Sequence, residues 1–105
     1  MTMKRSNADT DKFMQDLLGG PMSFGMAVEA LRVAAGISQV ALAKKLSISK
    51  AYLCDIEKGR RPATIERAIK IAKALGQPTE FFIKLALQSQ LDEAGVKLKV
   101  ELDAA

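Results

Sequence analysis

Residues 36–59 read GISQVALAKKLSISKAYLCDIEKG, and this stretch decides the fold because it holds two short helical patterns joined by a tight turn. Ser38 opens the first pattern and Ser49 opens the second, and a serine hydroxyl at such a position accepts a hydrogen bond from an orphan backbone N–H. Apolar residues recur at helical spacing through both patterns. They are Leu42, Ala43, Leu46, Leu53 and Ile56.

Further helix signals lie on both sides of this stretch. Ser23 can cap a helix that comes before residues 36–59. Thr64 can cap a helix that comes after them, and Gly76 ends that helix. Another helix starts after Pro78 and should last until residues 92–95. The sequence therefore predicts an all-α protein with a compact five-helix domain over residues 23–92.

The order of short motifs between Phe24 and Leu91 resembles that of the Cro/C1-type helix-turn-helix family. The motifs are Ser-Gln, Leu-Ala, Ile-Ser, Ile-Glu-Lys-Gly and Ala-Lys-Ala-Leu-Gly. The resemblance implies that the second helix of residues 36–59 enters the major groove of DNA. Ser47 departs from the family, which usually has glycine in this turn. At a positive φ, serine would add roughly 1 kcal/mol of strain without forbidding the turn.

The same resemblance implies a set of DNA-contacting residues. They are Ser38, Gln39, Ser49, Lys50, Ala51, Tyr52, Asp55, Arg60 and Arg61. Lys50 is the first choice for base reading because its ammonium can donate to guanine O6 or N7. Ala51 offers a methyl group for thymine, and Ser49 can bond a base or a phosphate.

Five of these positions have alternative interpretations. The Tyr52 ring can belong to the core, and Gln39 can be a solvated residue or a brace for the recognition helix. Asp55 can select a cytosine amino group or hold a basic side chain. Arg60 and Arg61 can contact phosphates or complement the C-terminus of the preceding helix, and the two roles are compatible.

A structural ion pair is also implied by the resemblance, between Arg32 and Glu57. In the family, the matching arginine and glutamate join the first helix of the domain to the recognition helix. The loss of one partner should destabilise such a partly buried pair more than the loss of both.

Composition and charge limit the chemistry. The chain has no histidine and one cysteine, which excludes an internal disulfide, histidine-based acid-base catalysis and the usual zinc sites. We therefore expect no enzyme, no cofactor and no metal. Residues 24–91 hold eleven basic and five acidic groups, a net charge of +6, which suits phosphate binding and also suits a solvated surface. With no membrane span and no signal peptide, a cytoplasmic location is expected.

Two flanks lie outside the predicted domain. Within residues 1–22, Thr10–Leu18 places Phe13, Met14, Leu17 and Leu18 at the spacing of a short amphipathic helix. Within residues 93–105, apolar residues alternate with charged ones, which predicts a β-strand that pairs with a second copy or another protein. A disordered tail is the alternative. The residues assigned to dimerisation are Val96, Leu98, Val100 and Leu102.

These observations predict a repressor that binds an inverted repeat of double-stranded DNA as a homodimer. The protein is not expected to bind a membrane. A second function belongs to another class. The chain is also similar to antitoxins of the HigA kind, which repress their operon and neutralise a small ribonuclease toxin. The two flanks would then be available to hold that toxin.

Overall fold

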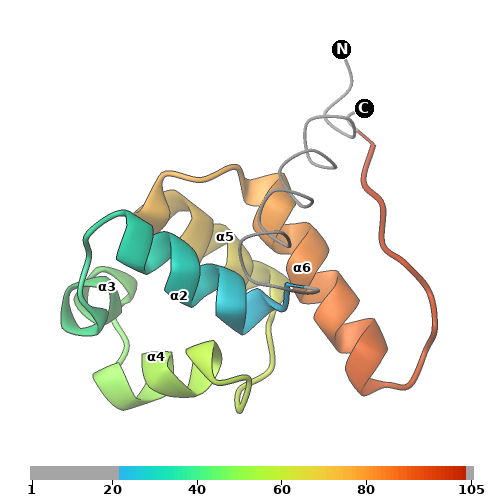
Figure 1. The fold of residues 1–105 in the computed structure, drawn as a ribbon, viewed down its shortest axis with the longest axis horizontal. Coiled ribbons are helices and arrows are strands. Elements are labelled where there is room, and N and C mark those ends of the chain that lie inside the picture. Colours follow the sequence, from blue (N-terminus) through green and yellow to red (C-terminus); the bar gives the residue numbers. More distant parts are fainter. Residues whose placement is uncertain (1–21, 104–105) are drawn as a thin grey trace.

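The computed structural model describes residues 22–103, and this part of the chain is built from helices and loops (Figure 1). The helices are α2 (Phe24–Ala34), α3 (Gln39–Leu46), α4 (Lys50–Glu57), α5 (Ile65–Leu75) and α6 (Thr79–Glu93). The prediction of a compact, all-helical domain with five helices is confirmed. The short helix predicted at Thr10–Leu18 lies outside the described residues.

Four of the helices begin with a hydroxyl cap, as the sequence indicates. In each case the side-chain oxygen accepts a hydrogen bond from the backbone N–H three residues later, at 3.0 to 3.2 Å. This bond satisfies one of the donors that a helix N-terminus leaves unpaired. The capping residues are Ser23, Ser38, Ser49 and Thr64. Helix α6 begins after Pro78 without such a side-chain bond.

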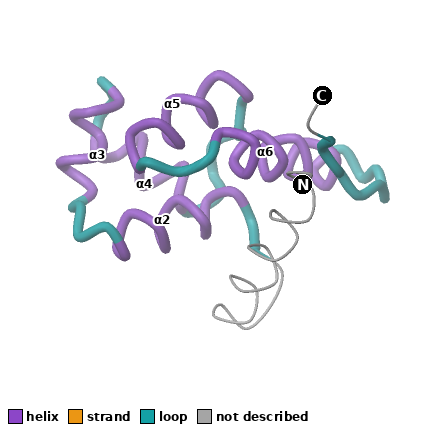
Figure 2. Tube along the Cα trace, turned by 90° about the horizontal axis from the view of Figure 1, so that it is seen from above, coloured by secondary structure: helices purple, strands orange, loops and turns teal. Residues whose placement is uncertain are grey.

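The core lies where α2, α5 and α6 pack on one another, and α3 and α4 close it from one end (Figures 1 and 2). Its largest fully buried side chains come from every helix. They are Val28, Leu42, Leu53, Ile71 and Phe82. Helix α4 contacts α2 and α3, so the expected recognition helix rests on two other helices.

Aromatic packing determines which face of α6 is buried. The sequence pattern predicts that Phe82, Ile83, Ala86 and Leu87 line this face. Phe82 and Ala86 are buried as predicted, but Ile83 and Leu87 are half-buried, and Phe81 and Leu85 are buried instead. The Phe82 ring meets Phe24 and Phe81 edge to face, with centroids 5.9 and 5.3 Å apart. Because both neighbouring phenylalanines of α6 must reach the core, the helix is rotated from the predicted orientation.

The helices are short, from 8 residues in α3 to 15 in α6. No single helix within residues 22–103 is long and apolar enough to cross a membrane. Helices α2 and α3 reach that length and composition only together, and they are bent by 112° at their junction.

The turn between α3 and α4 places Ser47 in the left-handed region, with φ 57° and ψ 41°. It has the only positive φ of a non-glycine residue among residues 22–103. The backbone N–H of Ile48 donates to the Ala43 carbonyl at 3.0 Å and closes the turn. The turn therefore has the conformation that the family's glycine would adopt, and it carries the strain of a Cβ atom.

We expect Ser47→Gly to raise the free energy of unfolding by about 0.5–1 kcal/mol, because the left-handed strain is removed and part of the gain is offset by the freer unfolded chain. Urea unfolding of the two proteins measures the difference. Ser38→Gly provides the contrast, because Ser38 has extended backbone and a capping bond to lose. An unchanged or lower stability of Ser47→Gly would show that the serine is not strained.

The prediction of a C-terminal β-strand is wrong for the described part of the chain, where residues 96–103 form an extended loop (Figure 2). A glutamine of α6 takes the place of a partner strand. Gln88 Nε2 donates to the Leu98 carbonyl and Gln88 Oε1 accepts from the Val100 N–H, both at 2.8 Å. Val100 and Leu102 become half-buried, while Leu98 stays 64% exposed. The alternating pattern thus predicted an extended backbone correctly, but it did not predict the side chain that forms hydrogen bonds with that backbone.

Candidate nucleic-acid interface

Helix α4 presents its first turn to solvent. Lys50 and Ala51 are exposed, whereas Leu53 and Ile56 on the opposite side are buried in the core. Ser49 precedes them as the N-cap, and its hydroxyl accepts from the Tyr52 N–H at 3.0 Å. A lysine and a methyl group are therefore free to meet base edges at the start of the helix, which is the part that enters the major groove in helix-turn-helix proteins.

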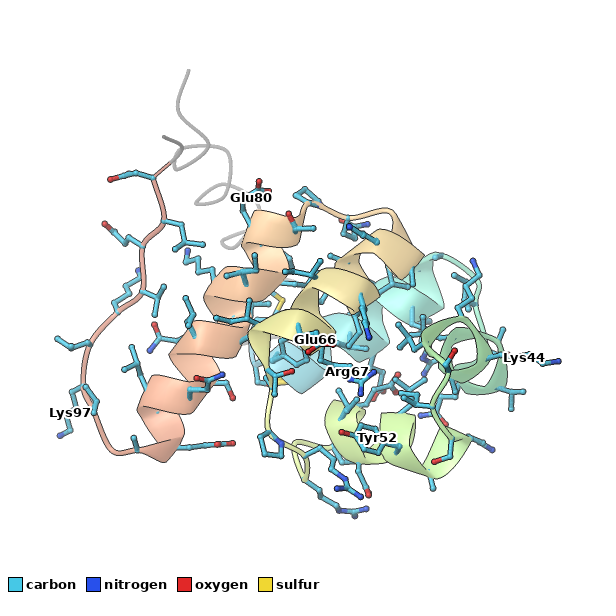
Figure 3. The ribbon with its side chains drawn as sticks, turned by 180° about the vertical axis from the view of Figure 1, so that it is seen from behind. Lys44, Tyr52, Glu66, Arg67, Glu80 and Lys97 are labelled. Carbon is cyan, nitrogen blue, oxygen red and sulfur yellow. The ribbon has the colours of Figure 1, made fainter. Side chains whose placement is uncertain are left out.

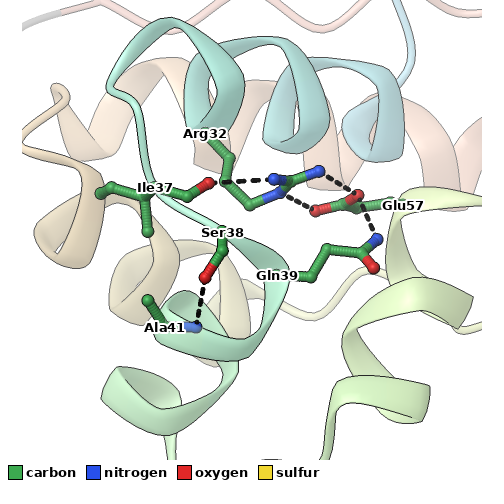
Figure 4. Close-up of polar contacts among 6 residues, drawn as sticks. All are labelled: Arg32, Ile37, Ser38, Gln39, Ala41 and Glu57. Carbon is green, nitrogen blue, oxygen red and sulfur yellow. Dashed lines mark hydrogen bonds and ion pairs between the residues drawn. The ribbon is translucent and has the colours of Figure 1, made fainter.

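The start of α3 is tied to the end of α4 (Figure 4). The Ser38 hydroxyl caps α3 by accepting from the Ala41 N–H at 3.0 Å. Gln39 is half-buried, and its Nε2 donates to Glu57 Oε1 at 2.9 Å. Of the two interpretations of Gln39, the structure shows the bracing contact with the recognition helix.

The ion pair expected between Arg32 and Glu57 is present (Figure 4). Arg32 Nε donates to Glu57 Oε2 at 2.7 Å, and the Arg32 Nη2 group donates to Oε1 at 3.2 Å, so the pair is bidentate. The Glu57 side chain is fully buried, and the Arg32 side chain is 12% exposed. The hydrogen bond to Glu57 raises the pKa of Arg32 above its ordinary value, against the effect of burial, so this guanidinium stays charged.

Arg32 also holds the loop that leads from α2 to α3. Its Nη1 group donates to the Ile37 carbonyl at 2.9 Å. Three elements thus meet at one carboxylate: the last turn of α2, the first residue of α3 and the last residue of α4. Because both charges are paired and hydrogen-bonded away from water, the network fixes the direction of α4 relative to the rest of the domain.

Arg60 and Arg61 lie in the loop after α4, next to Asp55. The Asp55 carboxylate is 3.4 Å from Arg60 Nη1 and 3.9 Å from Arg61 Nε. The Arg60 N–H also donates to the Asp55 carbonyl at 2.8 Å. Of the roles weighed for Asp55, the structure shows the one in which it holds basic side chains. Both arginines remain exposed, which keeps them accessible to phosphates.

Tyr52 is half-buried, and two guanidinium groups lie over its ring. The Arg61 carbon Cζ is 4.5 Å from the ring centroid, and that of Arg67 is 5.3 Å away. Both distances fall within the range of cation–π attraction. Figure 3 shows Arg67 reaching from α5 towards Tyr52 on α4.

Two residues of this region were not predicted from the sequence. An arginine in the first turn of a helix does not by itself predict a contact with another helix. The role of Arg67 therefore becomes visible only when α5 is placed beside α4. Gln90 of α6 donates through Nε2 to the Ala63 carbonyl at 2.7 Å and so fixes the end of the loop that carries the two exposed arginines. A polar residue on an amphipathic helix has no sequence feature that would predict this contact.

A family model described as helix-turn-helix matches residues 28–82. The chain belongs to the helix-turn-helix family. Membership identifies residues 28–82 as a helix-turn-helix domain of the Cro/C1 type. The matched residues run from the middle of α2 to the first turn of α6 and include α3, α4 and the arginine-rich loop.

Two curated relatives have regulatory names. The HTH-type transcriptional regulator RamB of Mycobacterium tuberculosis is 41% identical over 58 residues, which is 55% of this chain and 12% of RamB. The immunity repressor protein of Bacillus phage phi105 is 30% identical over 84 residues, which is 80% of this chain and 58% of the repressor. The chain therefore spans only part of the length of each.

Solved structures show the same fold. The restriction-modification controller protein C.AhdI from Aeromonas hydrophila is 30% identical with a TM-score of 0.53, over 56% of this chain and 89% of the other. The clp gene regulator ClgR from C. glutamicum is 27% identical with a TM-score of 0.55, over 63% of this chain and 86% of the other.

Proposed function

We propose that this protein is a sequence-specific repressor that binds double-stranded DNA through the first turn of α4. The observation that carries the proposal is the exposure of Lys50 and Ala51 on a helix whose opposite end is locked by the buried Arg32–Glu57 pair. A base-reading side chain needs a rigid support, because a loose helix would lose the geometry of its hydrogen bonds. The regulatory names of the relatives support this function. A cytoplasmic location belongs to the same proposal.

The site favours an inverted repeat as the target and a homodimer as the binding species. Each copy presents one recognition helix, and helix-turn-helix dimers place two such helices about 34 Å apart in successive major grooves. Two half-sites double the number of base contacts, which gives the specificity that a repressor needs over the excess of non-specific DNA.

The antitoxin alternative remains a prediction from the sequence resemblance. One flank that would hold a toxin, Thr10–Leu18, lies outside the described residues. In the other flank, the backbone of Leu98 and Val100 is bonded to Gln88 of α6. A toxin that adds a strand to this edge would first have to displace the glutamine side chain.

The experiment that tests the proposed function is Lys50→Ala. Selection of duplexes from a random pool gives the operator, and titrations of operators with single base-pair changes then give the base preference of each protein. We expect the substitution to remove the preference at one base pair in each half-site and to weaken operator binding by about 1–3 kcal/mol. The reason is the loss of a lysine donor to guanine.

Lys58→Ala is the matched control, because Lys58 is an exposed lysine at the opposite end of α4. It should leave the base preference at every position unchanged. If Lys50→Ala also left every position unchanged, Lys50 would not read a base. Equal binding of the unmodified protein to all duplexes would contradict the proposal that it is a sequence-specific repressor.

A further inference from the structure

A cluster of three arginines and one carboxylate lies between α4 and α5. We define it as the arginine cluster: Asp55, Arg60, Arg61 and Arg67, of which Arg61 and Arg67 lie over the ring of Tyr52. Asp55 is shared by Arg60 and Arg61, at distances of 3.4 and 3.9 Å that are long for ion pairs. The cluster therefore carries an excess of positive charge.

Arg67 is the arginine of this cluster that has no acidic partner among residues 22–103. Within residues 22–103 no carboxylate lies in ion-pair range of its guanidinium, although Glu66 precedes it in the chain. Glu66 instead pairs with Lys70, with Oε1 and Nζ 3.3 Å apart. Arg67 is half-buried and lies over the Tyr52 ring, which limits the rotamers it can adopt.

The position of this cation relative to α4 indicates its ligand. Tyr52 follows Lys50 and Ala51 in the first turn of α4, so Arg67 contacts the same turn that is exposed for base reading. When that turn lies in the major groove, the phosphates that border the groove come closest to the side chains around it. A half-buried guanidinium with no carboxylate partner, held by an aromatic ring, is prepared to bind such a phosphate with little further ordering.

We propose that Arg67 binds a phosphate of the DNA backbone and that the Tyr52 ring positions it beside Arg61 for this contact. The proposal rests on the proposed function, because it takes DNA as the ligand. It assigns to α5 a direct part in DNA binding, in addition to α3, α4 and the loop. Phosphate contacts of this kind fix the position of the protein on the duplex and carry no base preference.

Arg67→Gln tests the phosphate contact, with Lys70→Gln as the matched control on the same helix. Lys70 is exposed and paired with Glu66, so its loss changes the total charge equally without touching the cluster. The full-length proteins are titrated with the selected operator and with an unrelated duplex at several salt concentrations. We expect Arg67→Gln to lower the slope of log K against log salt by about one on both duplexes, and Lys70→Gln to leave it unchanged.

Arg67→Lys should keep the slope because it keeps the charge, which separates a phosphate contact from a packing role for the side chain. Thermal unfolding of all variants verifies that the domain is folded. An unchanged slope for Arg67→Gln would overturn the proposal and leave Arg67 as a brace between α4 and α5. This outcome is distinct from failure of the repressor, because the slope on the unrelated duplex is measurable even when no operator is preferred.

Discussion

Glu57→Ala should lower the free energy of unfolding by about 3–5 kcal/mol, because it leaves the Arg32 guanidinium almost buried without its counter-charge. The Gln39 amide loses its acceptor as well, so the contact between the start of α3 and the end of α4 is also lost. A small domain has only about 5–15 kcal/mol of stability, so much of it would be lost. Urea unfolding measured by circular dichroism gives the change. Operator binding should fall as well, since α4 loses its fixed direction.

Two comparisons isolate the buried pair. Glu66→Ala removes a glutamate whose side chain is 81% exposed and, within residues 22–103, is paired only with Lys70, so it should leave the stability nearly unchanged. The double variant Arg32→Met, Glu57→Met should be more stable than Glu57→Ala alone, because no charge is then left buried and unpaired. A Glu57→Ala protein as stable as Glu66→Ala would contradict the structural role of the pair.

Local signals in the sequence were sufficient to predict the helices of this fold. Hydroxyl caps at Ser23, Ser38, Ser49 and Thr64 act on the backbone within three residues, so they can be identified without knowing the tertiary structure. The left-handed conformation of Ser47 followed instead from the family resemblance, because the family usually has glycine in this turn. The family resemblance supplied the distant contacts that were foreseen, which are the Arg32–Glu57 pair and the brace from Gln39 to the recognition helix.

Contacts that depend on how two elements are placed in space were not predictable in this way. The alternation of residues 96–102 indicated an extended backbone, but the partner is the side chain of Gln88, which is far from any strand signal. Arg67 became a candidate phosphate ligand only when α5 placed it over Tyr52. Which side chains meet at a helix junction depends on tertiary packing, and local patterns in a single sequence do not show this packing.

The contact between α2 and α4 gives a prediction whose sign is opposite to that of helix propensity. Gly25 lies inside α2, where alanine normally stabilises a helix by up to about 1 kcal/mol. A Cβ atom at this position would lie 2.5 Å from the Ile56 carbonyl oxygen and 2.6 Å from that of Glu57. We therefore expect Gly25→Ala to destabilise the domain by roughly 1–3 kcal/mol, the usual range for overpacking.

The clash is with backbone atoms in the last turn of α4, so no side-chain rotation can relieve it and the two helices must move apart. That movement would strain the Arg32–Glu57 pair, which spans the same two helices. We expect the effects of Gly25→Ala and Glu57→Ala to be non-additive for this reason. Val33→Ala, at a position of α2 that is 61% exposed, is the control and should change stability by no more than about 0.5 kcal/mol. A Gly25→Ala protein with a raised midpoint of urea unfolding would mean that α2 and α4 separate without loss, and that close packing does not hold the recognition helix in place.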